Sequence, residues 1–157
     1  MEPKEITEVF VEALRETLST MAMLELEVDT IEPASEAAIQ ADVAATIGLS
    51  GSGRGMVLIT VSSALAPRVA ASMLGMEPEE IGTEEASDTV AELANMIAGG
   101  AKRAFASTEL AFNLSLPTRI VGAKPAIAPP SCVPGTLVRA RVSGEELQLG
   151  VWLEKAG

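Results

Sequence analysis

Hydrophobic and polar positions follow two different periods along the chain, and each period predicts a different kind of element. Over residues 5–23, apolar side chains recur every three or four positions with charged ones between them, which predicts an amphipathic helix with one buried face. Over residues 24–31, apolar and acidic residues alternate, which predicts a half-buried strand that Pro33 ends.

The same two periods predict the elements in the rest of the chain. Further strands are expected over residues 39–49, 55–62, 111–121, 136–142 and 147–153, with a glycine-rich turn at 50–53 and a tight turn at 143–144. A short helix is expected over residues 64–74, ended by Gly75, and a long one over residues 83–105, with Thr83 as its N-cap. A proline-rich link precedes the last two strands.

Read in order, these elements are a helix, three strands, a short helix, a long helix and three strands. The order suggests two αβββ halves and an α+β fold. A length of 157 residues fits one domain, and we find no interdomain linker. We therefore expect residues 1–157 to form a single domain.

The composition limits which residue types can form the core and which classes of partner the chain can bind. Hydrophobic residues make up 48% of the chain but aromatic ones only 3%, so we expect a core of Ala, Val, Leu, Ile and Met. Asp and Glu number 22 against 11 Lys and Arg, which gives a net charge of −11. Such a surface repels the phosphates of nucleic acids and anionic lipids, so neither is an expected partner. It suits a protein partner that offers a basic residue.

The absence of histidine excludes several kinds of active site, because Ser-His-Asp and Cys-His sites and His-ligated zinc all need it. The one cysteine, Cys132, cannot form an internal disulfide or a four-cysteine zinc site, and it suits a reducing compartment. We see neither a signal peptide nor an apolar run of about 18 residues. The expected location is the cytoplasm, and an enzyme would have to work with carboxylates, amides, hydroxyls and amines.

The helix predicted over residues 83–105 carries a polar stripe. At about 100° per residue, five positions fall within about 40° of Asp88: Asp88 itself, Glu92, Asn95, Gly99 and Lys102. The opposite side is apolar, with Val90, Leu93, Ile97, Ala101 and Ala104. The solvated side of any amphipathic helix has such a stripe. Asn95 and the pair Gly99-Gly100 are nevertheless poor residues for a helix interior, and close packing on a neighbouring helix is the structural explanation for the glycines.

The spacing Asp88-x-x-x-Glu92-x-x-Asn95, followed by Gly99-Gly100, resembles the CheC/CheX/FliY group of chemotaxis phosphatases. Supporting segments are Ile47-Gly48-Leu49-Ser50-Gly51, the stretch from Ala70 to Gly75, Leu116-Pro117 and Val121-Gly122, and the resemblance spans Ile6 to Trp152. The first helix has no asparagine at the required spacing after Glu12 or Glu16. One such helix per chain is similar to the CheX members of the group.

The resemblance implies a CheC-like fold, with long helices packed on an antiparallel sheet, and a homodimer. It also implies a phosphatase that removes phosphate from the phosphoaspartate of a CheY-like response regulator. Asn95 would orient the attacking water, and Glu92 would pair with the receiver's lysine and dock the helix. Asp88 would dock the partner or support the helix, and Gly99 would leave room for the partner.

No cofactor is expected on this chain, because Mg²⁺ would be held by the receiver. The alternative is a non-catalytic binding module of the same fold that docks a response regulator or a flagellar switch protein.

Overall fold

The computed structural model describes residues 1–35, 37–121, 126–130 and 133–157. Gly122 and Cys132, both named above, and Pro125 of the proline-rich link lie outside the described residues. The helices are α1 (Pro3–Ala22), α2 (Leu65–Leu74) and α3 (Thr83–Phe105), with a short 3₁₀ turn, η1, at Pro78–Glu80. In the described part of the chain, none of these helices is long and apolar enough to cross a membrane.

The strands form one large antiparallel sheet and one small one. The large sheet has the order β1-β8-β9-β4-β3-β5, and β6 pairs with β3 as well. Its strands are β1 (Leu26–Pro33), β3 (Val43–Gly51), β4 (Gly53–Val61), β5 (Phe112–Leu114), β6 (Thr118–Val121), β8 (Gly135–Val142) and β9 (Glu145–Lys155). The small sheet pairs β2 (Ile39–Gln40) with β7 (Ala126–Ile127).

The α+β fold of two αβββ halves is confirmed, and the halves interlock. Strand β1 of the first half pairs with the β8–β9 hairpin of the second half. In return, β5 and β6 of the second half pair with the β3–β4 hairpin of the first. Each half therefore completes the other's part of the sheet.

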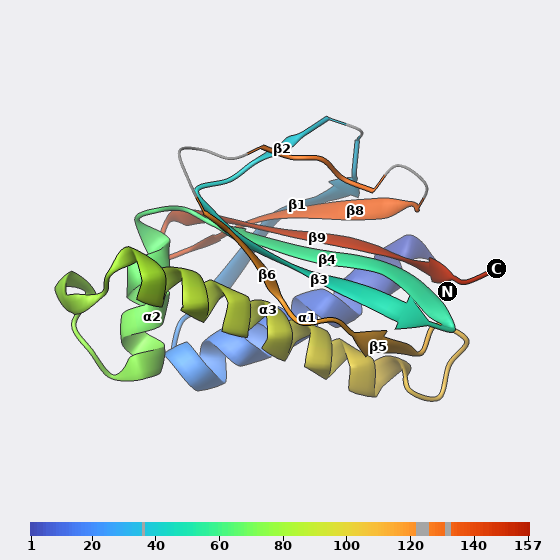
Figure 1. The fold of residues 1–157 in the computed structure, drawn as a ribbon, viewed down its shortest axis with the longest axis horizontal. Helices are drawn as coiled ribbons and strands as arrows, with labels where there is room; N and C mark the ends of the chain where they lie inside the picture. The colour runs from blue at the N-terminus through green and yellow to red at the C-terminus, as the bar shows by residue number, and fades with distance from the viewer. Residues whose placement is uncertain (36, 122–125, 131–132) are drawn as a thin grey trace.

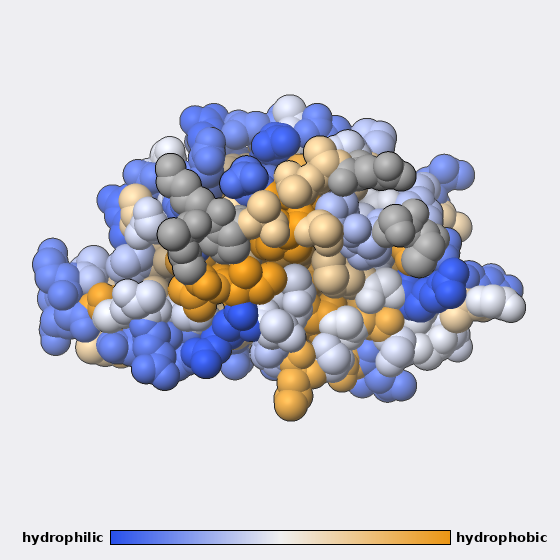
Figure 2. All heavy atoms as spheres, turned by 45° about the horizontal axis from the view of Figure 1, so that its top comes forward, coloured by the Kyte–Doolittle hydropathy of each residue, from blue (hydrophilic) through white to orange (hydrophobic). Residues whose placement is uncertain are grey.

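The sheet separates two layers, with α1, α2 and α3 on one face and the β2–β7 arm on the other (Figure 1). The larger core cluster lies between the helices and the sheet. A smaller cluster around Trp152 lies on the arm side. In the space-filling view, apolar side chains gather in the middle of the arm side with hydrophilic ones around them (Figure 2).

Methionine was wrongly expected in the core. Among the described residues the buried core is built from Ala, Val, Leu and Ile together with the aromatic residues Phe10, Phe105, Phe112 and Trp152. Met21 and Met76 are exposed instead, and Met73 only packs against the edge of the core. The few aromatic residues thus contribute more to the core than their 3% share suggests.

Two of the predicted strands are each divided into two shorter strands. The strand expected over residues 39–49 divides into β2 and β3, next to Asp42, whose carboxylate accepts a hydrogen bond from the Ser63 N–H at 2.9 Å. The strand expected over residues 111–121 divides into β5 and β6. Pro117 has no N–H to donate there, and the Ser115 hydroxyl accepts from the Gly48 N–H at 2.8 Å.

Two further details differ from the sequence prediction. The N-cap of α3 is Gly82, and Thr83 is the first helical residue. In β1 the register shifts between Val28 and Thr30, so Thr30 is exposed while Ile31 is half-buried. A bulge of this kind turns the following side chains to the other face of the sheet.

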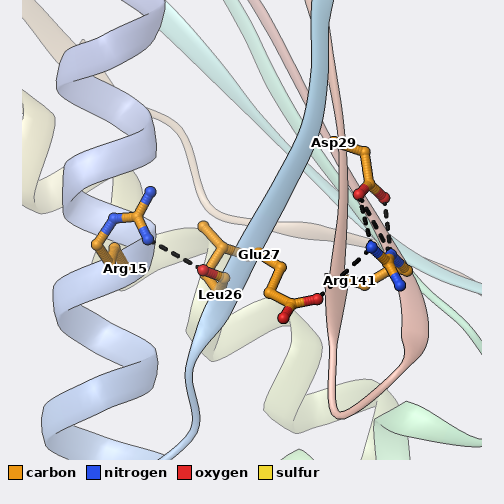
Figure 3. A network of polar contacts seen from close by, with 5 residues as sticks. All are labelled: Arg15, Leu26, Glu27, Asp29 and Arg141. Atoms are coloured by element: carbon orange, nitrogen blue, oxygen red, sulfur yellow. Dashed lines mark hydrogen bonds and ion pairs between the residues drawn. The ribbon is translucent and has the colours of Figure 1, made fainter.

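Polar contacts hold the edge strand β1 in place (Figure 3). Arg15 of α1 donates to the Leu26 carbonyl at 3.0 Å. Arg141 of β8 donates to the Asp29 carboxylate at 2.9 Å and lies 3.6 Å from the Glu27 carboxylate. The hydrogen bond from Arg141 holds the pKa of Asp29 below its ordinary value, and the same contact raises the pKa of Arg141.

Candidate functional site

Helix α3 is positioned by its buried face and by its contacts with α1. Its buried residues include Val90, Leu93 and Ile97. Acidic residues lie in its first turn and Lys102 and Arg103 in its last, which suits the helix dipole at both ends. Near its end the Phe105 ring lies 6.0 Å, centroid to centroid, from the Phe10 ring of α1.

The predicted polar stripe lies on the exposed side of α3. Asp88, Glu92 and Lys102 are exposed, while Asn95 and Gly99 are partly buried. The opposite side is buried as predicted, except that Ala104 is exposed. Ala104 is exposed because it lines the groove between α3 and α1.

Glu92 and Asn95 are available for a partner. Neither side chain takes part in a hydrogen bond or ion pair with any residue that the structure describes. Residues three apart on a helix are neighbours on one face, so a carboxylate and an amide stand side by side. The carboxylate can only accept hydrogen bonds or pair with a cation, whereas the amide can donate and accept at once.

Asp88 has a partner within the chain. Its carboxylate pairs with the guanidinium of Arg119 on β6, two residues after Pro117. Both side chains are exposed, by 61% at Asp88 and 43% at Arg119, so the ion pair links the start of the stripe to the sheet at the surface. Sequence reasoning missed Arg119, because nothing local marks a contact across 31 positions.

The two glycines of α3 differ in their surroundings. A Cβ added at Gly100 would lie 3.2 Å from the Ala13 Cβ of α1, so helix packing explains this glycine. A Cβ added at Gly99 would meet nothing within 4 Å. Packing within the described chain therefore explains Gly100 and leaves Gly99 without a structural reason.

A groove of ≈ 940 Å³ runs between α1 and α3, and Asn95 and Gly99 are among the residues that line it. The two helices are antiparallel, since Phe10 contacts Phe105 and Ala13 lies beside Gly100. The groove therefore runs along both helices, with Asn95 beside the second half of α1. In the described part of the chain, no three His, Cys, Asp or Glu side chains gather to form a metal site.

Comparisons with known proteins give a family match and several similar folds. A family model described as "Chemotaxis phosphatase CheX" matches residues 43–141, well over half of the 157 residues and including all of α3. A comparison with curated protein sequences gives no match.

Solved structures of chemotaxis proteins share the fold. The chemotaxis protein CheX of Vibrio vulnificus is 28% identical with a TM-score of 0.85, over 96% of this chain and 99% of that one. A CheX of Desulfovibrio desulfuricans is 25% identical with a TM-score of 0.84, over 97% and 99%. In the CheX-CheY-BeF3-Mg²⁺ complex of Borrelia burgdorferi, the matched chain is 23% identical with a TM-score of 0.78, over 96% and 98%.

Proposed function

The chain belongs to the CheX family of chemotaxis phosphatases, and we propose that it hydrolyses the phosphoaspartate of a CheY-like receiver domain with Asn95 and Glu92. The observation that carries the proposal is the exposed carboxylate of Glu92 beside the partly buried amide of Asn95 on α3, neither of which any described residue engages. The Borrelia protein of the same fold binds CheY in a complex with BeF3 and Mg²⁺, which supports a receiver as the partner.

In this proposal Asn95 orients the attacking water. A phosphoaspartate is a labile acyl phosphate, so a catalyst mainly has to hold water in line with the phosphorus. The amide oxygen accepts one hydrogen bond from the water while the amide NH₂ donates another. The water oxygen then bonds to phosphorus, and the bond from phosphorus to the aspartate oxygen breaks, leaving its electron pair on the carboxylate. One proton of the water stays on the new P–OH group, and the other passes to a second phosphate oxygen or to solvent.

Glu92 docks the helix in the receiver's site. A carboxylate one turn from Asn95 is placed to pair with a lysine of the receiver, and such charge-assisted hydrogen bonds are stronger than neutral ones. Gly99 leaves room for the receiver, which accounts for a glycine that the chain itself does not need. Asp88 supports α3 through Arg119 and borders the docking surface.

The proposal also covers the setting of the reaction. Mg²⁺ belongs to the receiver, whose acidic pocket would hold it beside the phosphoryl group, and this chain contributes no ligand to it. Residues 1–157 act as one domain, which is supported by the shared core of both halves. We place the protein in the cytoplasm as a homodimer, and light scattering would then give twice the chain mass of 16.2 kDa.

The test is the decay of a CheY-type receiver phosphorylated with acetyl phosphate in the presence of Mg²⁺. Wild type should accelerate the decay, and Asn95→Ala should lose about 100-fold of that acceleration, as expected for one transition-state donor. Glu92→Gln should mainly weaken binding. Lys102→Ala, on the same stripe, is the matched control and should behave as wild type.

Binding decides between the phosphatase and the non-catalytic module. Affinity for the receiver activated with BeF3⁻ and Mg²⁺ is measured for the same variants. If wild type binds this receiver and leaves its dephosphorylation rate unchanged, the chain is a binding module and the phosphatase proposal is wrong.

A further inference from the structure

The groove between α1 and α3 has one strongly acidic wall. Four carboxylates of α1 line it at intervals of three or four residues, so they follow one side of the helix: Glu5, Glu8, Glu12 and Glu16. Among the described residues that line the groove, Arg103 is the one cation. Because α1 and α3 are antiparallel, with Ala13 beside Gly100, the turn containing Glu16 lies next to the turn containing Asn95.

These carboxylates have little to pair with in the described chain. The side chains of Glu8 and Glu16 form no hydrogen bond or ion pair with a described residue, and Glu12 lies 3.4 Å from Arg15 in an exposed contact. Among the described residues, the Glu5 carboxylate accepts only the Glu2 N–H, at 3.3 Å. Like charges four residues apart destabilise a helix. The row of carboxylates therefore destabilises α1 in the free protein. A cationic partner in the groove would relieve this repulsion.

The floor of the groove is small and apolar. Val9 and Ala13 come from α1, and Met96, Gly99, Gly100 and Ala104 come from α3. Ala13 of α1 packs against Gly100, whereas nothing in the described chain fills the space above Gly99. A floor of this kind accepts the apolar side of a helix, in the manner of other grooves that bind amphipathic helices.

We propose that this groove receives a basic amphipathic helix of the receiver domain whose phosphoaspartate is hydrolysed. This inference rests on the proposed function and adds the chemistry of the recognised element. Lysine and arginine side chains of that helix face the α1 carboxylates, while its apolar side covers Met96 and Gly99. The acidic row thereby selects among receivers by the charge of this helix and steers the productive partner toward Asn95.

The test reverses charge on the wall without touching α3. Glu8→Lys/Glu16→Lys and the milder Glu8→Gln/Glu16→Gln are compared with Glu79→Lys/Glu146→Lys, which changes the net charge equally away from the groove. Circular dichroism checks that each variant is folded. Each is assayed for dephosphorylation of a CheY-type receiver and for binding of the same receiver with BeF3⁻ and Mg²⁺.

We expect the lysine pair to raise KM and the dissociation constant about 10-fold with kcat nearly unchanged, and the glutamine pair to raise them about 3-fold. Adding about 0.5 M NaCl should bring wild type and variants together, because exposed charges are then screened. Carbodiimide crosslinking should join α1 glutamates to lysines of one receiver helix.

The outcomes separate this inference from the proposed function. If wild type dephosphorylates the receiver and the lysine pair matches the Glu79/Glu146 control, the groove inference is wrong while the phosphatase stands. If the lysine pair weakens binding but wild type does not hydrolyse, the groove is correct and the phosphatase is wrong. If wild type neither binds nor hydrolyses the receiver, both are overturned.

Discussion

Gly99 and Gly100 offer a matched pair of substitutions on one helix. At Gly99 alanine has open space, so helix propensity alone should stabilise the protein by about 0.5–1 kcal/mol. At Gly100 the new methyl group would press on Ala13 at 3.2 Å and offset that gain. We expect Gly99→Ala to raise the urea midpoint and yet weaken receiver binding. A Gly99→Ala variant that binds as well as wild type would show that the space above Gly99 is not used.

Substitutions in the ion pair of Asp88 and Arg119 test whether Asp88 supports helix α3 or docks the receiver. Both side chains are exposed, so the pair should contribute less than about 1 kcal/mol to stability. We expect Asp88→Asn and Arg119→Gln to lower phosphatase activity by similar factors, since either change frees the start of the stripe from β6. The double variant should then be no worse than either single one.

A docking role for Asp88 predicts a different pattern from the support role. Asp88→Asn would then weaken receiver binding while Arg119→Gln would not. Comparing KM for the two single variants distinguishes these roles. Either substitution breaks a supporting ion pair, so in that case KM should change by the same factor in both variants.

At the scale of elements, helix α3 was predictable and the strand pairing was not. Its bounds, residues 83–105, follow from local signals such as apolar spacing, acidic first turn and basic last turn. The stripe of Glu92 and Asn95 follows from the same period of 3.6 residues. Whether β1 pairs with β8 depends on contacts more than 100 positions apart, which no local pattern encodes. The same limit hid Arg119 and the groove.

Strand β1 should loosen at low pH. The hydrogen bond from Arg141 holds the pKa of Asp29 below its ordinary value of 3.8, so the contact favours the folded state above that pH. Stability is lost as the pH falls through the lowered pKa and the carboxylate is protonated. We expect the protection factors of the β1 amides, which correct for the intrinsic pH dependence of exchange, to fall below about pH 4 in wild type. Asp29→Asn should show the lower protection factors already at pH 7 and no such change with pH.

Two glycines make room for Trp152 on the arm side of the sheet. A Cβ added at Gly135 would lie 2.1 Å from the indole ring, and one at Gly150 would lie 2.5 Å from it. Trp152 is almost fully buried, so the ring cannot move aside freely. We expect Gly135→Ala to destabilise the fold by about 1–3 kcal/mol or more, measured by urea unfolding. Gly157→Ala, which has open space at the chain end, is the control and should change nothing.

At the scale of the whole molecule, the interlocked halves bear on how the chain folds. The β8–β9 hairpin needs β1, and the β3–β4 hairpin needs β5 and β6, so neither half has a complete sheet of its own. Helices α1 and α3 also bury their inner faces in one common core cluster. A half alone would expose part of that apolar cluster to solvent, and it would leave a row of backbone groups without hydrogen-bond partners.

Cutting the chain at the exposed turn between Glu77 and Pro78 tests this directly. We expect fragments 1–77 and 78–157 to be largely unfolded alone, because each lacks the edge strand and the helix that the other supplies. Mixed at equal concentration, they should recover native circular dichroism and receiver dephosphorylation, with an apparent stability that rises with concentration. A native-like fold of either fragment by itself would show that its hairpin and helix form a sufficient core, and that the exchanged strands are not required for folding.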